Sequence, residues 1–167
     1  MRARMVMVML LLALGLTACD KKPSDAGNPA GTAAAPIGAA ECSACGMVVR
    51  EQPAPRGQVV HADGKRVHLC SIGDLVQYLA EPSPHGKPAA IYVETLDPAQ
   101  DPKQNATEER PWAPAESAGY VVGVERRGIM GKPVLAYPSR ELAVTAAARH
   151  KGQPKQWSEL HAHVTSH

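Results

Sequence analysis

Residues 58–69, QVVHADGKRVHL, are the stretch that decides the fold of this chain. Two short runs, 58–61 and 66–69, are rich in valine, which favours the pleated, half-buried surface of a strand. Between them stands Asp63-Gly64, a dipeptide typical of tight turns that join antiparallel strands. The stretch therefore predicts a β-hairpin.

A helix is expected directly after the hairpin. Ser71 stands where a serine hydroxyl can cap the first turn, and apolar residues then recur at helical spacing. The predicted helix runs from residue 72 to about 81 and ends before two nearby prolines. Its expected buried face carries Leu75, Tyr78 and Leu79. Residues 47–50 read as one further strand ahead of the hairpin.

The second half of the chain repeats this order of elements. Strands are predicted at 90–95, 120–124 and 134–137, with a polar, proline-containing excursion over 96–114. A helix follows at 139–149, with Leu142 and Val144 expected to face inward. The sequence GKRV at 64–67 is matched by GKPV at 131–134, 67 residues later. This similarity indicates a weak internal repeat.

These elements predict an α+β protein built from two small related β-β-α units. The first unit is expected over residues 41–88 and the second over 89–156. The last segment, 157–167, carries His161, His163 and His167 and reads as an unordered tail that collects divalent metals adventitiously.

The N-terminal segment predicts secretion and lipid attachment. Residues 1–18 carry Arg2 and Arg4 ahead of an apolar run that is short for a transmembrane helix. The run ends in Leu-Thr-Ala before Cys19, as in bacterial lipoprotein signals, so Cys19 is the expected lipidation site. Residues 19–40 are dominated by small and polar residues and predict a flexible linker between the lipid anchor and the folded part.

Charge and cysteine content narrow the function. Without Arg2 and Arg4 the chain has 16 basic and 16 acidic residues, so the basic face of a nucleic-acid binder is not expected. Beyond Cys19 three cysteines remain, an odd number outside the cytoplasm, which points to a reactive or metal-binding sulfur. No nucleophile with an evident base and orienting acid emerges, so an enzyme is not expected.

The candidate metal ligands lie within residues 41–47, ECSACGM. After the signal only two methionines remain, and Met47 stands two residues from Cys45. Thiolate and thioether together favour Cu(I), and Gly46 allows a bend that brings Cys45 and Met47 to one ion. Cys42 and Cys45 equally fit half of a structural zinc site, a thiol-disulfide redox pair or a short disulfide, and spacing leaves these alternatives open.

Other candidates have ordinary interpretations beside the functional one. Cys70, between a strand and a helix cap, is expected to be a buried and inert thiol. His61 and His68 lie on the hairpin, where either is a candidate ligand and a structural role is the default. Met130, between the second and third predicted strands of the second half, is either a ligand or a core residue.

Taken together, these motifs resemble the NosL family. The resemblance covers the lipoprotein signal, the Cys-Gly-Met triplet at 45–47, the HADG turn at 61–64 followed by CSIGDL at 70–75, and the MGK turn at 130–132. It extends over most of the chain after the signal. It implies a lipid-anchored, periplasmic Cu(I) chaperone whose ligands are Cys45, Met47 and Met130, with Cys42 less secure.

The resemblance also implies a biological setting. Copper would pass to a membrane ABC-type assembly complex and, through it, to the copper-sulfide centre of nitrous oxide reductase, in denitrification. A fold shared with organomercurial lyase and a possible homodimer are further implications. One thiolate with two thioethers would form a Cu(I) site of zero net charge, and its weak thioether ligands could be replaced one at a time by those of a recipient.

Overall fold

The computed structural model describes residues 31–104, 106–127, 129 and 131–166. Its elements are one 3-10 helix, seven strands and three α-helices within these residues, in the order η1 (Val49–Glu51), β1 (Gly57–His61), β2 (Arg66–Leu69), α1 (Ile72–Ala80), β3 (Pro88–Glu94), β4 (Trp112–Pro114), β5 (Gly119–Val122), β6 (Val134–Tyr137), α2 (Arg140–His150), β7 (Gln153–Lys155) and α3 (Trp157–Thr165). The mixed α and β composition expected from the sequence is confirmed.

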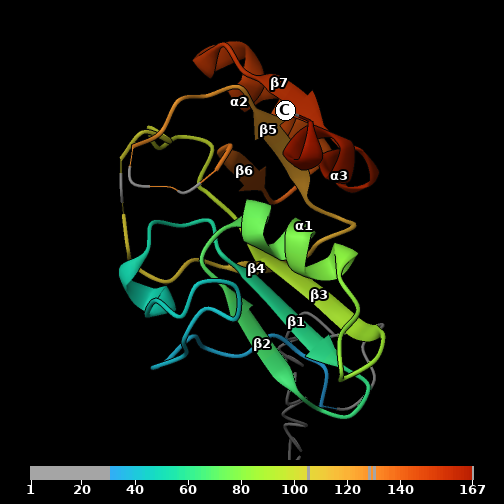
Figure 1. The fold of residues 1–167 in the computed structure, drawn as a ribbon. Helices are drawn as coiled ribbons and strands as arrows, with labels where there is room; N and C mark the ends of the chain where they lie inside the picture. Colours follow the sequence, from blue (N-terminus) through green and yellow to red (C-terminus); the bar gives the residue numbers. More distant parts are fainter. Residues whose placement is uncertain (1–30, 105, 128, 130, 167) are drawn as a thin grey trace, which may run out of the picture.

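The strands form two antiparallel sheets (Figure 1). The first has the order β2-β1-β3-β4, and the second β6-β5-β7. The predicted hairpin is confirmed: Gly57 pairs with Leu69 and Val60 with Arg66, and Gly64 in the turn has a φ of +84°. The strand expected to open the second unit, β3, instead pairs with β1 in the first sheet.

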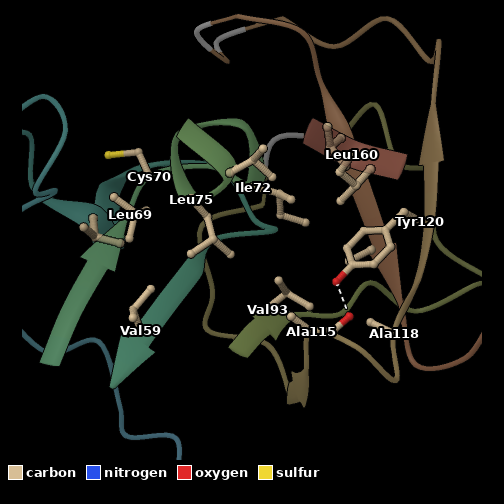
Figure 2. Close-up of a cluster of buried hydrophobic side chains, with 14 of the residues drawn as sticks. Val59, Leu69, Cys70, Ile72, Leu75, Val93, Ala115, Ala118, Tyr120 and Leu160 are labelled. Carbon is tan, nitrogen blue, oxygen red and sulfur yellow. Dashed lines mark hydrogen bonds between the residues drawn. The ribbon is translucent and has the colours of Figure 1, made fainter. Parts of the chain in front are cut away.

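One buried hydrophobic cluster, the core, joins both sheets, and a second cluster lies between α2 and the second sheet. The core contains Val59 and Val93 from the first sheet, Leu75 from α1, and Tyr120 and Leu160 from the C-terminal half. Figure 2 shows these side chains converging, with the Tyr120 hydroxyl donating a hydrogen bond of 2.6 Å to the Ala115 carbonyl oxygen. Because the core is continuous, the two halves pack as one body rather than as independent units.

Ser71 and Ser139 cap α1 and α2 as the sequence predicts. Ser71 Oγ accepts a hydrogen bond from the Asp74 amide, and Ser139 Oγ accepts one from the Leu142 amide. The prediction that Leu142 and Val144 of α2 face inward is wrong, since both side chains are exposed.

The buried face of α2 consists of Ala143, Ala146 and Ala147. The helix lies so close to β5 that a Cβ on Gly119 would stand 2.4 Å from the Ser139 carbonyl oxygen. Only small side chains fit between helix and sheet at this separation. The close packing of α2 on β5 therefore decides which face of the helix is buried, although Leu142 and Val144 are more hydrophobic than alanine.

Two further expectations are corrected. Residues 47–50 do not form a strand, because Val48 makes only an isolated bridge to Glu41 and the chain then turns into η1, where Val49 enters the core. The C-terminal segment is not an unordered tail, because it forms α3, whose Leu160 is fully buried against the core.

No helix among the described residues is long and apolar enough to cross a membrane. The expected signal segment and Cys19 lie outside the described residues. The internal repeat and the likeness to organomercurial lyase stay predictions.

Candidate metal centre

A tight loop carries the Cys-Gly-Met triplet. The Cys42 amide donates to the Met47 carbonyl oxygen, and the Gly46 amide donates to the Cys42 carbonyl oxygen, each at 2.8 Å. Gly46 has a φ of +75°, a conformation that residues with a Cβ rarely adopt. The bend expected at this glycine is therefore present, and Cys45 lies at the exposed tip of the loop.

The loop is docked on the edge strand of the first sheet. Cys42 bridges to His68 of β2, and the Ser43 amide donates to the His68 carbonyl oxygen at 3.1 Å. Since β2 has an open edge, its backbone groups are available to hold the loop. This docking places the loop beside the point where β2 ends and the chain turns into α1.

Cys70 occupies that turning point, and it completes a cluster of three thiols. The Sγ atoms of Cys42, Cys45 and Cys70 all lie within 4.8 Å of one another, and those of Cys45 and Cys70 are 3.7 Å apart. In Figure 2 the Cys70 sulfur points away from the labelled core side chains. All three cysteines are free thiols.

The two buried thiols have opposite electrostatic environments. Burial tends to raise the pKa of Cys42, but hydrogen bonds from the backbone of Ala44, Cys70 and Cys45 outweigh it, and the pKa is lowered. The Cys70 amide is one of these donors, at 3.3 Å from Cys42 Sγ. Burial, with the neighbouring Cys42, strongly raises the pKa of Cys70. Of these two buried thiols, Cys42 is therefore the more acidic and Cys70 the less acidic.

The spacing of the sulfurs suits one soft metal ion. With metal–sulfur bonds of about 2.3 Å, three sulfurs in a plane around one ion lie about 4.0 Å apart. The 3.7 Å between the Cys45 and Cys70 sulfurs and the upper limit of 4.8 Å for all three pairs bracket that value. A structural zinc ion takes four protein ligands, whereas no fourth cysteine and no histidine, aspartate or glutamate joins the cluster within the described part of the chain.

Met47 is linked to the cluster through a hollow that it shares with Cys70. Its side chain is 36% exposed, and it lines a hollow together with Cys70, Ser71, Asp74 and Ile129. The hollow has a volume of about 10 Å³, roughly the space of one water-sized sphere. Cys70 therefore belongs both to the thiol cluster and to the hollow that Met47 lines.

His61 lies at the opposite end of the hairpin from the cluster. It ends β1 beside the Asp63-Gly64 turn, whereas Cys70 follows the other end of β2, five residues along the hairpin or roughly 16 Å away at 3.3 Å per residue. Its Nδ1 contacts the Gly86 carbonyl oxygen at 2.9 Å, and its Nε2 contacts the Tyr78 hydroxyl at 2.9 Å. Both ring nitrogens are thus engaged in structural hydrogen bonds.

His68 is close to the loop in the sheet but is not a member of the cluster. The Gln58 side-chain amide donates to its Nε2 at 2.8 Å, which places the ring proton on Nδ1. Burial and the charge of Arg66 lower the pKa of His68, so its ring is neutral at pH 7.

Sequence reasoning missed Cys70. Its position between a strand and a helix cap is typical of an inert thiol, and only the docking of the 42–47 loop on β2 brings it to Cys42 and Cys45. Met130 lies outside the described residues, although the residue before it in sequence, Ile129, lines the hollow with Met47.

Comparison with known proteins identifies the family of the chain. The family model NosL matches residues 34–165, most of the chain. The chain belongs to the NosL family. The copper-binding lipoprotein NosL of Stutzerimonas stutzeri is 27% identical over 154 residues, covering 90% of this chain and 76% of the relative. The corresponding NosL of Achromobacter cycloclastes is 29% identical over 158 residues, covering 91% and 77%.

The fold is likewise similar to that of a solved NosL structure. The crystal structure of the copper chaperone NosL from Shewanella denitrificans matches with a TM-score of 0.63 at 24% identity. The match covers 77% of this chain and 95% of that one. The arrangement of two sheets and three helices is therefore a NosL fold.

Proposed function

We propose that this NosL-family protein is a lipid-anchored Cu(I) carrier and not an enzyme. The observation that carries the proposal is the convergence of three free thiols, with Met47 lining a hollow beside Cys70. Thiolates and thioethers are the ligands that Cu(I) prefers, and they disfavour Mg(II) and Ca(II). Its relatives from two organisms are named copper-binding lipoproteins, which supports the same cargo.

The ligands that we assign are Cys45 and Met47, with Met130 as a third. Cys45 lies at the loop tip and is exposed, so a copper donor or acceptor can reach it directly. Met47 is partly exposed and offers a weak thioether ligand. Such a ligand can leave the ion early and be replaced by one from a recipient, which suits transfer rather than storage.

The cellular role that we propose is delivery of copper for the copper-sulfide centre of nitrous oxide reductase. In this proposal Cys19 carries the lipid, the protein lies on the periplasmic face of a bacterial membrane, and an ABC-type assembly complex receives the copper. The family membership supports this role. The near balance of charge expected after signal removal supports a partner other than nucleic acid.

Copper binding is tested by anaerobic competition titration of the purified, detergent-solubilised protein against a chromophoric Cu(I) chelator. We expect one tightly bound Cu(I) per monomer, with affinity lowered at least about tenfold by Cys45→Ser. Ser43→Ala, an exposed change in the same loop, is the matched control and should bind like wild type.

Two results would refute this proposal. Failure of the wild-type protein to bind Cu(I) would show that Cu(I) is not its cargo. A zinc complex without which the protein unfolds would instead indicate a structural zinc module, because such sites supply the folding energy themselves. The delivery role is tested in a denitrifying strain that lacks its own copy: wild type should restore nitrous oxide reduction and Cys45→Ser should not.

A further inference from the structure

Cys42 and Cys70 have no role in a carrier site made only of Cys45 and the two methionines. Cys42 is 3% exposed and Cys70 is 6% exposed, yet their sulfurs lie beside that of the exposed Cys45. Neither thiol is in a disulfide. Two buried free thiols beside an exposed one suggest a role for all three, because three sulfurs at this spacing enclose a position for one ion.

We propose that the protein has two Cu(I) positions that share Cys70. The inner position is the one enclosed by Cys42, Cys45 and Cys70, and it holds copper at rest. The outer position is the hollow lined by Met47 and Cys70, from which copper leaves. This inference rests on the proposed function and deepens it by separating the ligands that retain the ion from the ligand that releases it.

The geometry favours retention at the inner position. The Cys42 sulfur is fixed by the Cys70 amide, and the loop that carries Cys42 and Cys45 is fixed on β2 by the contacts of Ser43. Two of the three cysteines, Cys42 and Cys70, are buried. Three thiolates held in place bind a soft ion more firmly than one thiolate with thioethers, because the anionic ligands add charge stabilisation and need little reordering.

The geometry favours release at the outer position. Met47 is partly exposed and lines the same hollow as Cys70, so the ion can exchange Cys42 and Cys45 for Met47 while it remains bound to Cys70. Each thiol that binds copper releases one proton to the solvent, and a thiolate that leaves the ion takes up a proton again. Copper remains Cu(I) throughout, so the exchange needs no oxidant or reductant.

The test uses the full-length protein under anaerobic, reducing conditions and compares Cys42→Ser, Cys70→Ser and Met47→Leu, with Ser43→Ala as control. Affinity is measured against a chromophoric Cu(I) chelator at equilibrium, and the rate of copper loss is measured after adding that chelator in excess. We expect Cys42→Ser and Cys70→Ser each to weaken retention at least about tenfold. Met47→Leu should change the affinity by less than about threefold and should slow copper loss.

X-ray absorption on the copper-loaded Met47→Leu protein gives a second measurement. Because Met47 is partly exposed, its replacement leaves the core intact, and the sulfur count at copper should stay at three. This readout keeps the proposal testable if a serine at a buried position impairs folding.

The outcomes separate this inference from the proposed function. Wild-type affinity in both Cys42→Ser and Cys70→Ser would overturn the inner position while leaving the carrier with Cys45 and Met47. Equal weakening by Met47→Leu and Cys70→Ser, or fewer than three sulfurs in the Met47→Leu protein, would show one mixed site and also overturn the inference. No binding of Cu(I) by wild type would overturn the proposed function itself.

Discussion

Arg56 and Glu94 form a bidentate ion pair in which both side chains are fully buried. Arg56 Nε lies 2.5 Å from Glu94 Oε2, and Arg56 Nη2 lies 2.7 Å from Glu94 Oε1. The guanidinium also donates to the carbonyl oxygens of Arg50 and Gln52 at 3.2 and 3.3 Å. The pair therefore fastens the turn that follows the Cys-Gly-Met loop to strand β3.

Replacing one partner of this pair should destabilise the protein strongly. Glu94→Gln leaves a buried guanidinium without its counter-charge, which costs about 3–5 kcal/mol in comparable pairs. Urea unfolding monitored by circular dichroism measures the change. The exposed pair of Lys155 and Glu159 supplies the control, because Lys155→Met should hardly change stability. Equal effects of the two substitutions would contradict the structural role of the buried pair.

The C-terminal helix should contribute to the core. Leu160 is fully buried, and Trp157 lies with its ring 5.8 Å from that of Tyr120. Leu160→Ala should lower the free energy of unfolding by about 2–5 kcal/mol, because it removes a buried side chain and leaves a cavity. The exposed neighbour His161 is the control, and His161→Ala should be close to neutral. Wild-type thermal stability in Leu160→Ala would mean that the segment is a tail after all.

Two glycines should respond in opposite ways to alanine. A Cβ on Gly119 would lie 2.4 Å from the Ser139 carbonyl oxygen and 2.7 Å from Ala143 Cβ, so Gly119→Ala must push α2 away from β5. We expect destabilisation of about 1–3 kcal/mol from this overpacking. In α1, a Cβ on Gly73 meets only ordinary contacts, at 3.5 Å or more.

Gly73→Ala should therefore stabilise the protein by about 0.5–1 kcal/mol, since alanine is the better helix former. Denaturant midpoints of the two variants and wild type, measured in parallel, provide the comparison. Stabilisation by both substitutions would show that α2 does not pack as closely on β5 as the structure has it.

Stability should fall as pH drops through the range in which free histidine titrates. The pKa of His68 is lowered by burial and by Arg66, so the unfolded chain binds a proton more readily than the folded one. The contribution of His68 to the free energy of unfolding is therefore fully present above about pH 6.5, the pKa of histidine in the unfolded chain. It is lost progressively as the pH falls toward the lower pKa of His68 in the folded protein. His163, whose pKa is lowered by partial burial and by Lys132, acts in the same direction.

His68→Gln should make the free energy of unfolding less dependent on pH between about 5 and 7, because the titrating ring is gone. Urea unfolding of the variant and wild type across this range measures the difference, and an NMR titration of the ring gives the folded pKa directly. A ring pKa above the ordinary value would reverse the predicted sign and contradict the structure.

Local signals in the sequence were enough to predict the main elements. The Asp63-Gly64 turn, the capping serines Ser71 and Ser139 and the valine-rich strands depend on neighbours a few residues away, so their chemistry can be read along the chain. The same holds for the bend at Gly46. Where the outcome depended on distant neighbours, the predictions were wrong. The buried face of α2 is set by its contact with β5, and the C-terminal segment forms a helix, α3, whose Leu160 packs into the core.

For the candidate metal site, the sequence by itself determined that Cys42, Cys45 and Met47 lie close together and that their ligand types favour a soft ion. Only the tertiary structure decided that Cys70 joins them and that His61 does not. The reason is that Cys42 is 28 residues from Cys70, and the two meet because the cysteine loop docks on the open edge of β2. Such a contact depends on which backbone groups a sheet leaves unpaired, a property of the assembled fold that no local pattern in the chain records.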